Sequence, residues 1–166
     1  PLRTHLAVGA GALLIVLALL WFLVLEPEGE TVVFPPAELL ADGLGHFERK
    51  EYDLAVEVLQ KVPADSPESA EALYYRGSSN IMLKDYEAAT KSLEQALALK
   101  PRDTGTLYAL GVASYRLGNV TLAKGYFASV LEINPNDEQA KGLYDIMARL
   151  ERASAAEPGE EGDTSE

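Results

Sequence analysis

Similar residues return every 34 positions through most of this 166-residue chain. Six columns share this period and one register: Pro67, Pro101 and Pro135; Gly43, Gly77 and Gly111; Ala55, Ala89 and Ala123; Leu39, Leu73 and Leu107; Leu59, Leu93 and Phe127; and Val62, Ala96 and Val130. A fixed period of this length is typical of solenoids, in which each unit packs only against its neighbours. The chain is therefore expected to fold as stacked copies of one unit, because a single copy cannot bury its apolar face alone.

Each copy contains two stretches in which apolar residues recur three and four positions apart, and this spacing predicts two helices per copy. The stretches are 36–48, 52–62, 68–83, 86–99, 104–117 and 120–133. Asp85 and Asn119 are predicted to cap the helices that follow them, and Ser66-Pro67 is predicted to begin another. Gly77 is predicted to lie where two paired helices cross closely.

These residues resemble the tetratricopeptide repeat family, whose small and apolar signature positions match the columns above. With each column proline at repeat position 32, the copies are 36–69, 70–103 and 104–137, and 138–152 resembles a capping helix. The resemblance implies an all-α fold, a helical solenoid of three helix-turn-helix repeats plus the capping helix.

An uncharged run at positions 6–25 precedes the repeats, and most of it is Leu, Ile, Val or Phe. As a helix the run would span roughly 30 Å, the thickness of a bilayer core. A cleaved signal peptide has a shorter apolar core of about 7–15 residues. We therefore expect residues 1–25 to hold a short flank and a single transmembrane helix in contact with the lipid bilayer, rather than a signal peptide or a buried soluble helix.

The basic residues near this run predict its orientation. Arg3 precedes the run, and no Lys or Arg follows it until Arg49, so the positive-inside rule places the N-terminus in the cytoplasm. The repeats would then be extracytoplasmic, and we expect a bacterial inner membrane and periplasm. Ala7, Gly11 and Ala18 fall near one helical face, where they would pack against another transmembrane helix or simply face lipid.

Acidic residues concentrate on both sides of the repeats. The linker 26–35 contributes −3 and the C-terminal segment 153–166 contributes −5 to the net charge of −12. The C-terminal segment has no large apolar side chain, which predicts a disordered acidic tail. The repeats themselves are therefore close to ordinary in charge, and the acidity indicates little about a ligand.

The resemblance also implies that the first helix of each pair lines a groove that binds a peptide or a partner protein. The predicted groove consists of Phe47, Tyr74, Tyr75, Ser78, Tyr108, Val112, Tyr115 and Arg116. Tyrosine combines a large contact area with a hydroxyl group, which suits peptide recognition. The alternative is that several of these side chains simply pack between adjacent repeats.

One branch of the family binds terminal carboxylates of its partners through Lys, Asn and Arg in this groove. The corresponding residues of this chain are Leu40, Leu44, Ser78, Gly105 and Ala109. None of them donates a charge-assisted hydrogen bond, so the chain departs from that pattern and is not expected to receive chaperone tails.

Signs of catalysis or cofactor binding are missing from the sequence. The chain has no cysteine and two histidines, and it contains no phosphate-binding glycine loop, zinc-ligand pair or nucleophile elbow. We therefore expect no enzyme activity, metal, cofactor or small-molecule substrate. An acidic chain is also a poor candidate for binding nucleic acid.

These features together predict a membrane-anchored scaffold or adaptor that binds proteins, such as membrane-complex subunits, and aids assembly of a membrane or envelope complex. Two alternatives remain open. The protein could be a structural accessory subunit of a respiratory, photosynthetic or transport complex, held mainly by its transmembrane helix. It could also be an import-type receptor whose repeats lie in the cytosol.

Overall fold

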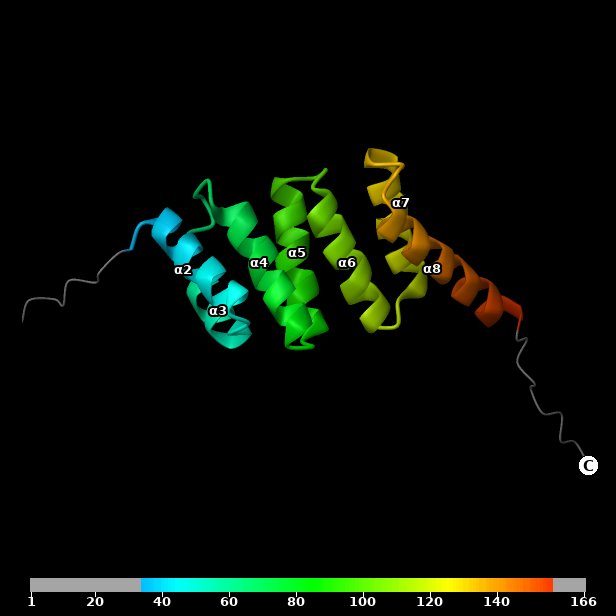
Figure 1. The fold of residues 1–166 in the computed structure, drawn as a ribbon, viewed down its shortest axis with the longest axis horizontal. Coiled ribbons are helices and arrows are strands. Elements are labelled where there is room, and N and C mark those ends of the chain that lie inside the picture. The colour runs from blue at the N-terminus through cyan, green and yellow to red at the C-terminus, as the bar shows by residue number, and fades with distance from the viewer. Residues whose placement is uncertain (1–33, 157–166) are drawn as a thin grey trace, which may run out of the picture. The chain divides into compact units, whose positions relative to one another are not determined.

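The computed structural model describes residues 34–156, which form seven α-helices (Figure 1). All seven helices belong to one compact unit, which begins at Pro35. In chain order the helices are α2 (Pro36–Glu48), α3 (Tyr52–Leu59), α4 (Ser69–Met82), α5 (Tyr86–Leu99), α6 (Thr104–Arg116), α7 (Val120–Ile133) and α8 (Glu138–Ala156).

The helices pack in consecutive pairs. Helix α2 packs on α3, α4 on α5, and α6 on α7, and further contacts join α2 to α4, α4 to α6 and α7 to α8. Figure 1 shows the resulting row of helices, from α2 at one end to α8 at the other. The predicted all-helical solenoid is confirmed. Among the six helices of the repeats only α3 departs clearly from its predicted span, because it ends at Leu59 rather than at residue 62.

The glycines of the repeated column lie where the two helices of each pair cross. A Cβ atom at Gly77 would lie 2.5 Å from the Cγ of Leu93 and 3.2 Å from the carbonyl oxygen of Ala89. A Cβ atom at Gly43 would come similarly close to the side chain of Leu59, and one at Gly111 would come similarly close to the ring of Phe127. The predicted close crossing at Gly77 is therefore confirmed, and the same crossing recurs in all three pairs.

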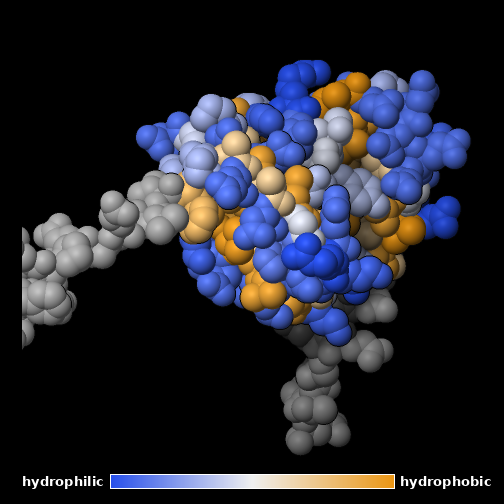
Figure 2. All heavy atoms as spheres, turned by 60° about the vertical axis from the view of Figure 1, so that its left-hand side comes forward, coloured by the Kyte–Doolittle hydropathy of each residue, from blue (hydrophilic) through white to orange (hydrophobic). Residues whose placement is uncertain are grey.

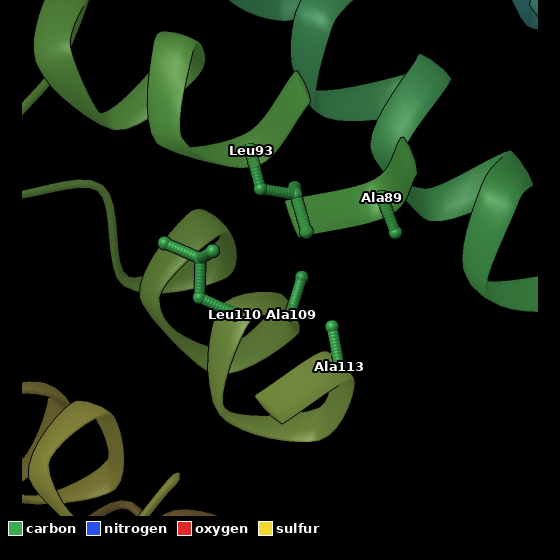
Figure 3. Packing of buried hydrophobic residues seen from close by; sticks show 5 residues of the cluster. All are labelled: Ala89, Leu93, Ala109, Leu110 and Ala113. Carbon is green, nitrogen blue, oxygen red and sulfur yellow. The ribbon is translucent and has the colours of Figure 1, made fainter. Parts of the chain in front are cut away.

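Small and large apolar side chains alternate in the core between consecutive pairs. Figure 3 shows Ala89 and Leu93 of α5 facing Ala109, Leu110 and Ala113 of α6, each at most 8% exposed. The alanines let the two helices approach, while the leucines fill the remaining space.

Other apolar residues remain at the surface. Leu54, Met82, Leu99, Leu122 and Ile146 are between 46% and 55% exposed. Viewed with the α2 end turned forward, the surface shows hydrophobic patches between hydrophilic side chains (Figure 2).

Two of the predicted helix starts need correction. The carboxylate of Asp85 accepts a hydrogen bond from the amide of Ala88 at 3.0 Å, as predicted for a cap. Asn119 occupies the N-cap position of α7, but its side chain accepts no hydrogen bond from that helix. The start predicted at Ser66-Pro67 is wrong, because the hydroxyl of Ser66 donates to the carbonyl of Pro63 and helix α4 begins at Ser69.

Just after the first helix of each pair, one residue has a left-handed backbone conformation. Lys50, Lys84 and Gly118 have φ angles of 62°, 64° and 83°, and they fall at the same place in successive repeats. After each of them, the next amide donates to the carbonyl five positions earlier, which is the Schellman geometry. What recurs at this position is therefore the backbone conformation and not a side-chain function, since lysine and glycine share no side-chain chemistry.

Helix α8 closes the C-terminal end of the row. Ala140 and Met147 are buried, and Glu151 forms an ion pair with Lys124 and accepts a hydrogen bond from Thr121 at 2.8 Å. The helix extends to Ala156, so residues 153–156, which the sequence assigned to the acidic tail, are helical.

No helix between residues 34 and 156 is long and apolar enough to cross a membrane. The predicted span at residues 6–25 lies outside the described residues, together with Ala7, Gly11 and Ala18. Most of the linker and residues 157–166 also lie outside them.

Candidate partner-binding groove

Three rings from two neighbouring repeats form an aromatic row, which consists of Phe47, Tyr75 and Tyr74. The ring centres of Phe47 and Tyr75 are 5.2 Å apart, and those of Tyr75 and Tyr74 are 5.1 Å apart, both in edge-to-face contact. Such contacts contribute about 0.5–1.5 kcal/mol each beyond the area they bury. The aromatic row therefore joins α2 to α4 through three members of the predicted groove.

The two tyrosines point toward different repeats because they are consecutive on one helix. Tyr75 packs against the buried cluster of the first repeat, which includes Leu59. Tyr74 packs against the cluster between α5 and α6, and a Cβ atom at Gly105 would lie 3.6 Å from its ring. Both rings are half-buried, so each packs between repeats and also presents part of its surface to solvent.

A pocket of about 190 Å³ adjoins the aromatic row. Its lining residues come from α4, from α5 with the following loop, and from the start of α6; they are Ala70, Glu71, Tyr74, Tyr75, Ala96, Lys100, Asp103 and Thr106. Asp103 is fixed in place, since its carboxylate accepts hydrogen bonds from the amide and the hydroxyl of Thr106, at 2.7 Å and 2.6 Å. The pocket thus combines two aromatic walls with one cation and two carboxylates.

Burial raises the pKa of the Tyr75 hydroxyl, and the negative charge of Glu71 raises it further. The hydroxyl group therefore stays protonated at neutral pH and is able to donate a hydrogen bond. Beside the rings, this donor lets the surface recognise a carbonyl or carboxylate oxygen.

The predicted groove residues of α6 form a second group. Tyr108 and Val112 pack against the buried cluster of Ala123, Phe127 and Met147, the last of which lies on α8. The rings of Tyr108 and Phe127 are 5.6 Å apart. Part of the surface of Tyr108 and Val112 is therefore already used in packing within the domain.

The remaining predicted groove residues are less enclosed. Tyr115 is 41% exposed and Arg116 is exposed, both at the C-terminal end of α6, while Ser78 of α4 is half-buried. The structure thus brings Phe47, Tyr74 and Tyr75 into contact, whereas a binding role for all eight residues stays a prediction.

Sequence reasoning missed Lys100 and Thr106 as neighbours of the tyrosines. Neither was among the residues predicted to line the groove, and only the return of the chain from α5 to α6 brings them to Tyr74. Among residues 34–156, no group of three His, Asp or Glu side chains is placed to hold a metal ion.

Two family models, each described as a tetratricopeptide repeat, match residues 40–103 and 81–150. No curated protein matches the sequence.

Several solved structures share the fold. The first repeat domain of Spaghetti (RPAP3), bound to an HSP90 peptide, is 24% identical over 70% of this chain and 93% of its own, with a TM-score of 0.67. The Sgt2 repeat domain of Aspergillus fumigatus is 21% identical over 83% and 97%, with a TM-score of 0.65. MamA is 26% identical over 80% and 84%, with a TM-score of 0.61.

Proposed function

We propose, on the premise that residues 40–150 belong to the tetratricopeptide repeat family, that this domain binds a peptide segment of a partner protein. The aromatic row and its adjoining pocket carry the proposal, because they combine half-exposed rings with hydrogen-bonding groups on the first helices of adjacent repeats. Aromatic side chains in such a setting contribute strongly to protein interfaces. The similarity to repeat domains solved with peptides supports a role in protein interaction.

The chemistry of the groove favours a partner segment with apolar and polar residues in alternation. The rings of Tyr74 and Tyr75 offer apolar contact, and the Tyr75 hydroxyl offers a donor. Lys100 attracts a carboxylate, whereas Glu71 and Asp103 disfavour a segment rich in acidic residues. This mixed charge fits the absence of Lys and Arg at the positions where relatives bind terminal carboxylates.

The test uses peptides selected from a random phage library on the full chain. Affinity is measured by fluorescence anisotropy for the wild type and for a double variant, Tyr74→Leu with Tyr115→Ala. Leucine keeps apolar packing near Gly105 while removing the ring and hydroxyl, and Tyr115 is exposed, so helicity should be retained. We expect binding to weaken about tenfold or more, as for truncated anchor residues.

Leu122→Ala is the matched control, because Leu122 is 48% exposed on α7, outside the predicted groove. It should leave the affinity unchanged. Equal affinities for the double variant and the wild type would refute peptide binding at the groove. An equal loss of affinity in the double variant and in Leu122→Ala would show that the peptides bind elsewhere.

We propose further that residues 6–25 anchor the domain in a membrane and that the repeats face away from the cytoplasm. The uncharged run and the position of Arg3 support this proposal. In that place the domain would bind subunits of a membrane or envelope complex during assembly. Protease treatment of intact cells tests the orientation, since protection of the repeats on the cytoplasmic side would overturn it.

A chain without residues 1–25 tests whether the partner is bound by the groove or by the transmembrane helix. A groove-driven adaptor should still bind the selected peptides and its partner when the anchor is removed. Loss of the partner with retained peptide binding would instead indicate an accessory subunit held by its transmembrane helix.

A further inference from the structure

A second hollow lies between α3, α4 and α5, and none of the predicted groove residues lines it. This α3–α5 pocket has a volume of about 490 Å³. Its walls are largely aliphatic, from Leu59, Val62, Leu73 and Leu99, and its polar lining includes Arg76 and Gln95. Leu99 is 51% exposed, so the apolar wall continues onto the protein surface.

The guanidinium group of Arg76 is half-buried in this pocket without an acidic partner. Its Nε donates to the hydroxyl of Ser92 at 3.0 Å, and one terminal nitrogen donates to the amide oxygen of Gln95 at 3.4 Å. Within residues 34–156 no carboxylate forms an ion pair with Arg76. Burial alone lowers its pKa. The group therefore bears a desolvation cost that only neutral acceptors offset.

The next interface in the solenoid is filled at the equivalent positions. Leu110 stands one repeat period after Arg76, and it is fully buried in the cluster of Figure 3. Tyr126 stands one repeat period after Ser92 and packs against the same cluster. The second repeat thus has a cation and a small hydroxyl where the third has a leucine and a tyrosine. Packing alone explains the third repeat, but it does not explain a charge and open space in the second.

We infer that the α3–α5 pocket is a second binding site, which takes a protein segment with a Glu or Asp side chain beside an aliphatic one. The carboxylate would accept two hydrogen bonds from the guanidinium group of Arg76, the geometry that arginine favours. The aliphatic neighbour would lie against Leu59, Val62 and Leu73. A protein segment fits better than a small aliphatic acid, because the apolar wall at Leu99 leads the occupant out onto the surface.

The test titrates the full chain with fluorescent peptides that have blocked termini. One peptide carries a Glu-Leu pair, and its partner carries a Gln-Leu pair at the same place. For the wild type we expect the Glu peptide to bind about tenfold more tightly, the size of a charge-assisted contact of about 1.4 kcal/mol. Added salt should reduce this preference.

Two kinds of variant separate the effect of the Arg76 charge from the effect of the open volume in the pocket. Arg76→Leu should abolish the preference for the Glu peptide, and Arg76→Lys should keep part of it. Ser92→Tyr places a ring beside Arg76 at the position that Tyr126 occupies one repeat later, and it should weaken both peptides. Leu110 shows that the repeat accepts leucine at this position, so Arg76→Leu should fold with unchanged helicity.

Arg149→Leu is the control for general electrostatic attraction, since Arg149 is exposed on α8 and lines neither the predicted groove nor the α3–α5 pocket. It should keep the full preference. The inference is overturned if Arg76→Leu retains the preference, if Arg149→Leu loses it, or if octanoate displaces the Glu peptide at equal concentration, which would indicate a site for small aliphatic acids. Because the groove variants leave this pocket intact, either site can fail independently.

Discussion

Replacement of Gly77 by alanine tests whether the crossing of α4 and α5 is as close as the structure indicates. The added methyl carbon would lie 2.5 Å from the Cγ and 2.8 Å from the Cδ2 of Leu93, inside the contact distance of carbon atoms. Leu93 is fully buried, so its side chain has no free space into which to move. The carbonyl of Ala89, at 3.2 Å, belongs to the backbone of α5, so relief requires the two helices to separate.

Two opposing effects set the size of the change. Alanine is the better helix former by about 1 kcal/mol. Overpacking of a close core typically costs about 1–3 kcal/mol, and the two contacts below the normal limit place Gly77 in the upper half of that range. The expected net loss is therefore about 1–2 kcal/mol of the free energy of unfolding.

Gly125→Ala is the matched control, because a Cβ atom at Gly125 in α7 would meet nothing within 4 Å. Only helix propensity acts there, so this variant should gain about 0.5–1 kcal/mol. Urea denaturation of each full-length variant, monitored by far-ultraviolet circular dichroism, measures both changes in the free energy of unfolding. A stability gain in Gly77→Ala similar to that of Gly125→Ala would refute the close crossing, and a loss in Gly125→Ala would refute the propensity term.

Four further changes have expected outcomes, each checked by the same denaturation assay. Asp103→Ala removes the acceptor of two hydrogen bonds at the start of α6 and should cost about 1–2 kcal/mol. Ser114→Ala removes a buried hydroxyl without a partner among the described residues and should stabilise by about 0.5–1 kcal/mol. Lys84→Gly relieves the left-handed backbone at φ 64° and should stabilise by about 1 kcal/mol. Glu151→Gln should loosen α8, because it breaks the ion pair with Lys124.

Each of the first three changes has its own control. Asn119→Ala should cost less than Asp103→Ala, since Asn119 makes no capping bond. Ser79→Ala should not stabilise, because the hydroxyl of Ser79 donates to the carbonyl of Tyr75 at 2.8 Å. Gly118→Ala should destabilise, as the reverse of Lys84→Gly. An inverted order in any pair would contradict the assigned contact.

The Glu151 prediction also has a pH dependence. Hydrogen bonds from Lys124 and Thr121 lower the pKa of Glu151, so the folded state binds this proton less readily than the unfolded state. Its contribution is present above the ordinary glutamate pKa and is lost as pH falls through the lowered value. The stability difference between the wild type and Glu151→Gln should therefore be larger at neutral pH than at pH about 3, and a constant difference would show that the ion pair does not form.

The repeat period determined most of the fold from sequence alone. Small residues at Gly43, Gly77 and Gly111 recur because the same two helices cross in every copy, and this contact constrains residue type locally. Five of the six helix spans predicted within the repeats agree with the observed ends to within a single position, since proline, glycine and Asp85 act on their own neighbouring backbone. The groove aromatics were named through the family resemblance; Phe47, Tyr74 and Tyr75 do lie in contact, and their binding role stays a prediction.

Only the tertiary structure decided how these side chains are shared between packing and surface. Tyr108 and Val112 pack toward Met147 because α8 lies against α7, a docking that neither segment specifies by itself. The left-handed ends at Lys50 and Lys84 were not predicted from the sequence, since lysine is not a residue that indicates this backbone geometry; only Gly118, the third residue of the column, is.

The α3–α5 pocket shows the same limit most clearly. In the sequence Arg76 is an ordinary charged helical residue, and its half-buried, acid-free surroundings arise only where three helices meet. Sequence determined the repeating unit because its constraints act between near neighbours along the chain. The structure decided which interfaces are filled and which are hollow, because that depends on side chains brought together from separate helices.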